Sequence, residues 1–302
     1  MSLSGCSRMK TAAWSRGILR VMRACNLAAL PVLAALSLHT AVGAAEHAAP
    51  AHAITLTPHI TELIFAAGAG HLIVATVTSS DYPPSALAIP RIGDGMNISI
   101  EKALSFRPDL VVAWQASSAA LTLAPALDQL HIPLLYSTPR TLGDIPREVR
   151  RFGALFHTQD IAEAAAQDLN TRLQTLENDY STRTSVPVFI EIGTNPVYTV
   201  GNDPLLNDAL RVCGARNVYA DAFSAAPQVS AESVLVAQPA VIITSATDTD
   251  ALQAATARWS RLHLPAALRG HVYGIDPDTL FRPGPRLIDA VEALCQYIDK
   301  SR

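Results

Sequence analysis

The chain has 302 residues, of which 49% are apolar and 16% are charged, and its formal net charge is −3. This length allows two modest domains, each with a buried core. The slightly acidic balance argues against nucleic acid as a partner and against a basic membrane-binding face.

The first 45 residues have the pattern of a secretory signal peptide. The small residues 41–45 follow an apolar run from Leu27 to Leu38, which is shorter than the ~20 residues that a membrane helix needs. A basic stretch without acidic residues comes first, namely Arg8, Lys10, Arg16, Arg20 and Arg23. We therefore expect residues 1–45 to be removed on export to the periplasm. The mature chain would start near Ala45 or Glu46 and would carry a formal charge of about −8, because five basic and no acidic residues are lost.

Two of the four cysteines, Cys6 and Cys25, leave with the predicted signal peptide. The other two, Cys213 and Cys295, would then lie in an oxidising compartment, which favours a disulfide between them. Two buried free thiols are the alternative.

Strands and helices alternate along residues 52–140. Short apolar runs predict strands at 54–57, 72–78, 110–114 and 132–136. Pro58 opens a helix that continues through Ala67, and the glycines at 68 and 70 end this helix. A second helix is expected at 99–106. This alternation predicts a parallel sheet covered by helices.

The stretch 141–183 differs from what precedes it and is interpreted as a linker. Residues 160–180 contain neither Gly nor Pro and carry apolar residues at helical spacing, which predicts one long helix. The apolar stripe comprises Ala162, Ala165, Ala166, Leu169, Leu173 and Leu176. Because a continuous helix resists bending, lobes joined by it should move little relative to each other.

The second half of the chain repeats a pattern of the first. Ser, Glu, Leu and Pro recur in the same order before a run of apolar residues, starting once at Ser99 and once at Ser230, and every matching pair is 131 residues apart. We infer an α/β protein of two similar lobes with parallel sheets, joined by one long rigid helix. The N-terminal lobe takes residues 52–140, the linker takes 141–183 and the C-terminal lobe takes 184–300.

The chain resembles periplasmic binding proteins of ABC importers whose lobes are joined by a helix, a family that binds siderophores, haem and vitamin B12. The resemblance covers essentially the whole mature chain. Its most specific segments are Ser80-Asp81-Tyr82-Pro83-Pro84 and Pro227-Gln228-Val229-Ser230, with further matches at Thr61-Glu62-Leu63, Gly95-Met96-Asn97, Arg107-Pro108-Asp109-Leu110-Val111 and Pro285-Arg286.

The resemblance implies that the ligand is vitamin B12 or a related corrinoid, held between the lobes without any cofactor. Haem or an iron-siderophore complex is the alternative. A corrinoid needs aromatic walls for its faces and a few hydrogen-bonding groups for its rim. The positions that match ligand contacts of the family are Tyr82, Trp114, Tyr198, Asp278 and Arg282. The family carries tryptophans where this chain has the Gly93-Asp94 region and Ala226.

The resemblance also implies a partner, the permease dimer of an inner-membrane ABC importer. Glu101 and Glu232 occupy equivalent places in the two repeats, and matching glutamates of the family dock onto permease arginines. Two like lobes on one monomeric chain suit a two-fold partner. The alternative is that each glutamate only interacts with the dipole of its own helix.

Other chemistry has weaker support. His59 follows the first strand and could ligate cobalt or haem iron, although a solvated imidazole is the simpler interpretation. No close pair of histidines indicates a dedicated metal site. No Gly-x-Ser-x-Gly, His-Glu-x-x-His or Walker sequence occurs, and only Glu191 with Asp203 offers a candidate carboxylate pair, so we do not expect an enzyme.

Overall fold

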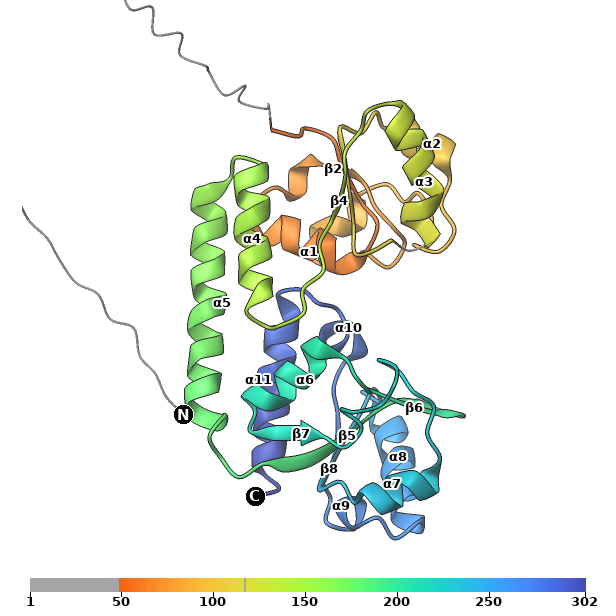
Figure 1. Cartoon of the computed structure of the whole chain (residues 1–302), viewed down its shortest axis with the longest axis vertical. Coiled ribbons are helices and arrows are strands. Elements are labelled where there is room, and N and C mark those ends of the chain that lie inside the picture. The colour runs from red at the N-terminus through yellow and green to blue at the C-terminus, as the bar shows by residue number, and fades with distance from the viewer. Residues whose placement is uncertain (1–48, 117) are drawn as a thin grey trace, which may run out of the picture. The chain divides into compact units, whose positions relative to one another are not determined.

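The computed structural model describes residues 49–116 and 118–302. The predicted signal peptide, 1–45, lies outside these residues, as do Cys6 and Cys25. Two sheets form, one from each half of the described chain, and each is flanked by helices (Figure 1). None of the helices in the described ranges is long and apolar enough to cross a membrane.

The N-terminal sheet has four parallel strands in the order β2-β1-β3-β4. The strands are β1 (Ala53–Thr55), β2 (Ile73–Ala75), β3 (Leu110–Ala113) and β4 (Leu134–Tyr136), and the helices between them are α1 (Pro58–Ala66), α2 (Ile100–Ser105) and α3 (Ser118–Gln129). All four strands were expected, but β2 is shorter than the predicted 72–78. It is an edge strand that pairs only with β1, so fewer of its residues are held in a ladder.

The C-terminal sheet repeats this order as β7-β5-β8-β9 and adds the antiparallel strand β6 beside β5. Its strands are β5 (Val186–Thr194), β6 (Val197–Thr199), β7 (Ala215–Asn217), β8 (Val241–Thr244) and β9 (Val272–Gly274). Its helices are α6 (Pro204–Val212), α7 (Ala231–Ala237), α8 (Thr249–Arg261), α9 (Pro265–Leu268), α10 (Pro277–Leu280) and α11 (Arg286–Asp299).

The 131-residue repeat is visible in the local geometry. Ser99 caps α2 by accepting from the backbone N–H of Lys102 at 3.2 Å, and Ser230 caps α7 by accepting from that of Ser233, also at 3.2 Å. The strands that follow, β3 and β8, each lie between two parallel neighbours. The expected fold class, two similar α/β lobes, is confirmed.

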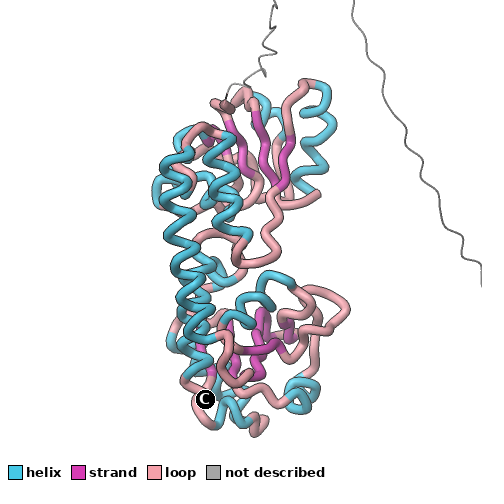
Figure 2. Tube along the Cα trace, turned by 60° about the vertical axis from the view of Figure 1, so that its left-hand side comes forward, coloured by secondary structure: helices cyan, strands magenta, loops and turns pink. Residues whose placement is uncertain are grey.

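The linker contains one helix more than the sequence predicted. The long helix α5 spans Gln159–Tyr180, as expected, but α4 (Asp144–Leu155) precedes it and packs along it (Figures 1 and 2). Gly153 of α4 lies directly against Ala162 of α5, where a side chain on the glycine would collide with the alanine. The two helices therefore approach closely at this point.

One apolar cluster continues from the first lobe through the linker into the second. It includes Leu63 of α1, Phe152 of α4, Leu169 of α5 and Leu287 of α11, all buried. Four residues of the predicted α5 stripe are buried and the other two, Ala165 and Leu173, are partly buried against the cluster. The lobes thus share a core along the linker side.

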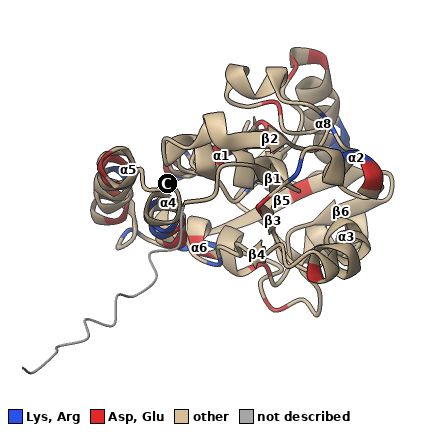
Figure 3. Cartoon of the chain, turned by 90° about the horizontal axis from the view of Figure 1, so that it is seen from above, with Lys and Arg blue, Asp and Glu red and all other residues tan. Residues whose placement is uncertain are grey.

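The disulfide between Cys213 and Cys295 is present and closes a sequence separation of 82 residues. Cys213 ends α6 and Cys295 lies in α11, so the bond ties two helices of the C-terminal lobe. The alternative of two free thiols is wrong. Charged positions are sparse along the described chain, and both signs are mixed on it (Figure 3).

Candidate functional site

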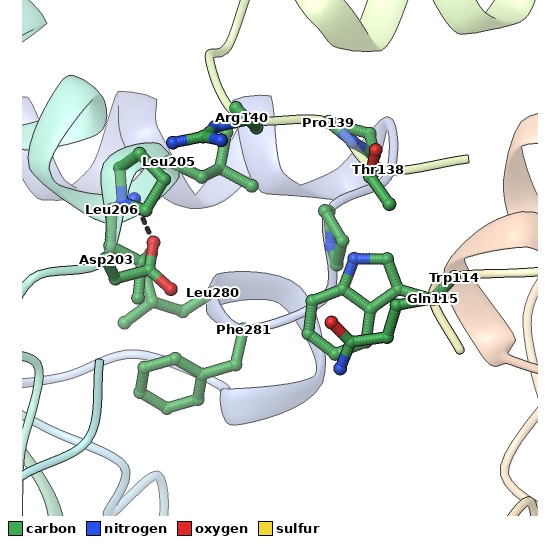
Figure 4. Close-up of a pocket in the computed structure, with 12 residues that line it drawn as sticks. Trp114, Gln115, Thr138, Pro139, Arg140, Asp203, Leu205, Leu206, Leu280 and Phe281 are labelled. Atoms are coloured by element: carbon green, nitrogen blue, oxygen red, sulfur yellow. Dashed lines mark hydrogen bonds between the residues drawn. The ribbon is translucent and has the colours of Figure 1, made fainter. Parts of the chain in front are cut away.

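The cavity between the lobes is the first feature of the candidate site. It has a volume of about 430 Å³, within the usual range for small-molecule sites. Trp114, at the carboxyl end of β3, and Phe281, after α10, supply aromatic surface from opposite lobes (Figure 4). The other lining residues are Gln115, Thr138, Pro139, Arg140, Asp203, Pro204, Leu205, Leu206, Leu280 and Pro283.

Two charged residues of this cavity were not among the expected ligand contacts, Arg140 and Asp203. One carboxylate oxygen of Asp203 accepts from the backbone N–H of Leu206 at 2.9 Å and caps α6, while the other turns toward the cavity (Figure 4). The Asp203-Pro204 pair is a helix-start signal in the sequence. Arg140 follows β4 by four residues, and the loops that follow parallel strands gather at one edge of the sheet, where ligands bind. The helix-start pair and the position after a parallel strand could therefore have identified Asp203 and Arg140 from the sequence.

Trp114 packs against a buried histidine. Its side chain is 40% exposed, and its ring meets that of His59 edge to face with centroids 5.6 Å apart. His59 is only 3% exposed, so the interpretation as a solvated imidazole is wrong. Burial, helped by the charge of Arg282, lowers the pKa of His59 to about 3, and its Nε2 has no hydrogen-bond partner. A neutral imidazole therefore supports the tryptophan.

Charged residues of both lobes meet beside the cavity. We call Glu62, Asp81, Asp278, Arg282 and Arg286 the interlobe charge cluster. Arg286 donates to Glu62 through Nε at 3.0 Å and through Nη2 at 2.6 Å. Arg282 bonds Asp81 at 2.7 Å and Asp278 at 2.7 Å. The predicted ligand contacts Asp278 and Arg282 thus already have protein partners.

Burial and pairing shift the pKa values of this cluster. Burial raises the pKa of Glu62, and the hydrogen bond and charge of Arg286 offset that rise only in part. The hydrogen bond from Arg282 lowers the pKa of the more exposed Asp81. The hydrogen bonds that Arg286 donates to Glu62 in turn raise the pKa of Arg286. Glu62 is the deeply buried carboxylate of the cluster, 3% exposed.

The two predicted tyrosines lie apart from the main cavity. Tyr82 is 43% exposed, stacks on the Arg286 guanidinium with its ring centroid 4.2 Å from Cζ, and lines an adjoining hollow of about 320 Å³ with Glu62, Phe65, Ala66, Pro83 and Pro285. Tyr198 is half-exposed on β6, next to Gln228, and is not a lining residue of either space. The structure therefore brings Trp114, Tyr82, Asp278 and Arg282 into one region and leaves Tyr198 outside it.

The predicted docking glutamates are both exposed, and each lies in the first turn of its helix. Hydrogen bonding from the backbone of Glu232 itself, and then from the side chain of Ser230, lowers the pKa of Glu232. Both the docking role and the helix-dipole role are compatible with this position.

The candidate carboxylate pair has structural partners instead of a shared site. Glu191 is 1% exposed, receives a hydrogen bond from Trp259 Nε1 at 2.6 Å and pairs with Arg258. Asp203 caps α6. Within residues 49–116 and 118–302, no group of three or more His, Cys, Asp or Glu side chains is arranged to hold a metal.

The chain belongs to the periplasmic binding protein family, whose sequence model matches residues 54–279. Among its relatives, the vitamin B12-binding protein of Vibrio cholerae serotype O1 is 35% identical over 247 residues, which cover 81% of this chain and 88% of the relative. The vitamin B12-binding protein of Photorhabdus laumondii is 32% identical over 253 residues, which cover 84% and 90%.

Solved structures agree with this assignment. The periplasmic vitamin B12 binding protein BtuF of Vibrio cholerae superposes with a TM-score of 0.76 at 34% identity and covers 83% of this chain and 98% of its own. The periplasmic haem-binding protein RhuT from Roseiflexus sp. RS-1, at 24% identity, has a TM-score of 0.71 over 83% and 99% of the two chains and shares the fold.

Proposed function

We propose that this chain captures vitamin B12 or a related corrinoid between its lobes in the periplasm and delivers it to an ABC importer. The cavity with its exposed Trp114 wall is the observation that carries this proposal. A flat macrocycle gains most from aromatic surface against its face, and its rim amides need polar partners. Gln115, Thr138 and Arg140 offer such partners along the N-terminal side of the cavity.

The similarity to vitamin B12-binding proteins over most of the chain supports the same ligand. A binding role without chemistry agrees with the family and with the structural partners of Glu191 and Asp203. Export to the periplasm agrees with the pattern of residues 1–45 and with a disulfide elsewhere in the chain.

Delivery would use one glutamate from each lobe, Glu101 and Glu232. Each is exposed, and each lies at the same place in its repeat. A permease dimer presents the same basic patch twice, so two equivalent acids on one monomeric chain fit its symmetry.

The experiment is isothermal titration of the exported protein with cyanocobalamin and with cobinamide, which lacks the nucleotide loop. We expect one-to-one binding of cyanocobalamin, and cobinamide reports whether the nucleotide loop contributes. Absorbance titrations with haem and with a ferric siderophore serve as the comparison. Binding of haem without binding of either corrinoid would reject the proposal.

Haem is the second candidate, since an imidazole can ligate its iron and His59 lies against Trp114. His59 would have to leave its buried position to do so, because it is 3% exposed. An iron-siderophore complex fits less well, because such anionic ligands tend to need several basic groups. Arg140 is the basic residue that lines the cavity, whereas Arg282 is paired with carboxylates.

A further inference from the structure

A two-bond ion pair between the lobes, beside the cavity, joins Glu62 to Arg286. Glu62 lies in α1 of the N-terminal lobe, and Arg286 is the first residue of α11 in the C-terminal lobe. Two N–H groups of one guanidinium meet the two oxygens of one carboxylate, at 3.0 and 2.6 Å. This fork geometry fixes both distance and orientation, which a single point contact does not.

The backbone before Arg286 is fitted closely to α1. A Cβ atom on Gly284 would lie 3.4 Å from Glu62 Oε2 and 3.5 Å from the Cβ of His59. The segment 281–286 therefore rests directly on the face of α1 that carries both residues. Phe281 and Pro283 of the same segment line the cavity, so its position sets one wall of the site.

Glu62 also reaches two of the predicted ligand contacts through its arginine partners. The Arg286 guanidinium that it holds stacks on the ring of Tyr82 at 4.2 Å. Its Oε1 lies 3.8 Å from Nη1 of Arg282, which in turn bonds Asp81. One buried carboxylate is thus connected to Tyr82 and Arg282.

We propose that Glu62 is the positioning residue of the ligand site, which ties the 281–286 segment to α1 and so sets Tyr82, Arg282 and Phe281 relative to Trp114. This role rests on the proposed function in so far as those side chains meet the ligand. A buried ion pair gives little net stability, because desolvation of the charges offsets most of their attraction. The shared core along α4 and α5 already joins the lobes on the linker side. What the pair adds is a fixed geometry at the cavity.

The test compares Glu62→Gln with Glu292→Gln in cyanocobalamin titrations. Glu292 pairs with Arg172 of α5 at 2.7 Å, away from the lining residues of the cavity, so its variant controls for the loss of an ion pair as such. We expect Glu62→Gln to weaken binding at least tenfold and Glu292→Gln to leave it within twofold. Arg286→Lys, which keeps the charge but loses the fork and the stacking on Tyr82, should weaken binding as Glu62→Gln does.

A double variant separates positioning from general damage. If Glu62 acts through Arg286 and Tyr82, the effects of Glu62→Gln and Tyr82→Ala overlap. The affinity of the double variant for cyanocobalamin should then lie within twofold of that of the single variant with the lower affinity. The proposal would be overturned if the fold-loss of affinity in the double variant equalled the product of the two single fold-losses. It would also be overturned if Glu62→Gln bound cyanocobalamin as native protein does.

A second measurement does not depend on the ligand. The described residues belong to one compact unit. Leu121 on α3 and Val236 on α7 are exposed at 60% and 84%. Spin labels on Leu121→Cys and Val236→Cys report the distance between the lobes by pulsed electron resonance. We expect the distance distribution to broaden in Glu62→Gln and to stay native in Glu292→Gln. If native protein binds no corrinoid, the proposed function fails, and an unbroadened distribution would then separately reject the positioning role.

Discussion

The rings of His59 and Trp114 meet edge to face, 5.6 Å apart at 84°, at the point where α1 and the end of β3 come together. The histidine is buried and the tryptophan is half-exposed toward the cavity. The neutral imidazole of His59 thus packs beneath the indole of Trp114 and supports it on the side away from the cavity.

Replacement of Trp114 by alanine should weaken cyanocobalamin binding by about 10- to 100-fold, because an aromatic wall in the centre of an interface carries a large share of binding energy. Isothermal titration measures the loss. Phe223→Ala is the matched control, since Phe223 is fully exposed and does not line the cavity, and its affinity should be native. Native affinity in Trp114→Ala, or an equal loss in both variants, would contradict a specific contact between Trp114 and the ligand.

His59 should make the folded protein less stable in mild acid. Its pKa is about 3 in the folded chain and 6.5 for an unperturbed imidazole, so between these values the unfolded chain binds a proton that the folded chain does not. The contribution of His59 to the free energy of unfolding is complete above pH 6.5. It falls as the pH is lowered, by roughly 2 kcal/mol at pH 5. Urea unfolding at pH 5 and pH 7 measures the difference.

The variant His59→Leu isolates this effect. Because Nε2 has no partner, an apolar side chain of similar size should cost little at pH 7. The variant should lose roughly 2 kcal/mol less than native protein between pH 7 and pH 5. Glu62, whose pKa is raised, acts in the opposite direction, since its contribution is present below pH 4.5 and is lost as pH rises. Identical pH profiles for native and variant would exclude a buried neutral His59.

Most of the fold was predictable because its signals are local. Pro58 marks the start of α1 and Gly68 marks its end. Apolar runs mark the strands, and the repeat that starts at Ser99 and again at Ser230 identifies two lobes. Helix α4 escaped prediction because it contains Pro146 and Gly153, two residues that usually argue against a helix. Pro146 lies in the first turn, where its missing N–H costs nothing, and Gly153 is required by the close approach to α5.

The site was predictable only in part because its geometry depends on residues far apart in the chain. The sequence at the start of α1 predicts solvent exposure, but Trp114 and the 281–286 segment, which follows more than 220 residues later, both lie against His59. The pairing of Arg282 with Asp81 joins residues 201 positions apart. Neither relationship has a signature in local spacing, so sequence analysis could name Arg282 and its neighbour Asp278 but not the pairing of Arg282 with Asp81.

Reversal of the charges of the two proposed docking residues should separate transport from binding. The double variant Glu101→Arg, Glu232→Arg should abolish most cobalamin uptake in cells while cyanocobalamin affinity stays native, because like charges repel at the permease surface and neither residue lines the cavity. Uptake of labelled cobalamin and isothermal titration measure the two properties.

The control for this variant makes the same charge change elsewhere. Asp160 and Asp168 are exposed on α5, and Asp160 also lies in the first turn of its helix. The double variant Asp160→Arg, Asp168→Arg should transport as native protein does. If uptake is lost equally in both double variants, net charge alone explains the effect and the docking role is excluded.

The disulfide should matter for stability and little for the ligand. It joins the end of α6 to α11, and α6 presents Leu205 and Leu206 to the cavity while α11 begins with Arg286. Replacing Cys213 and Cys295 together by alanine should lower the free energy of unfolding by roughly 4 kcal/mol, because a long loop is no longer closed in the unfolded chain. Native packing around both residues is apolar and fully buried, so the helices should keep their places below the melting transition.

Differential scanning calorimetry of this double variant should show a lower Tm, while titration with cyanocobalamin below that temperature should give native affinity. Loss of affinity in the folded variant would mean that the bond also holds the α6 wall of the cavity in place.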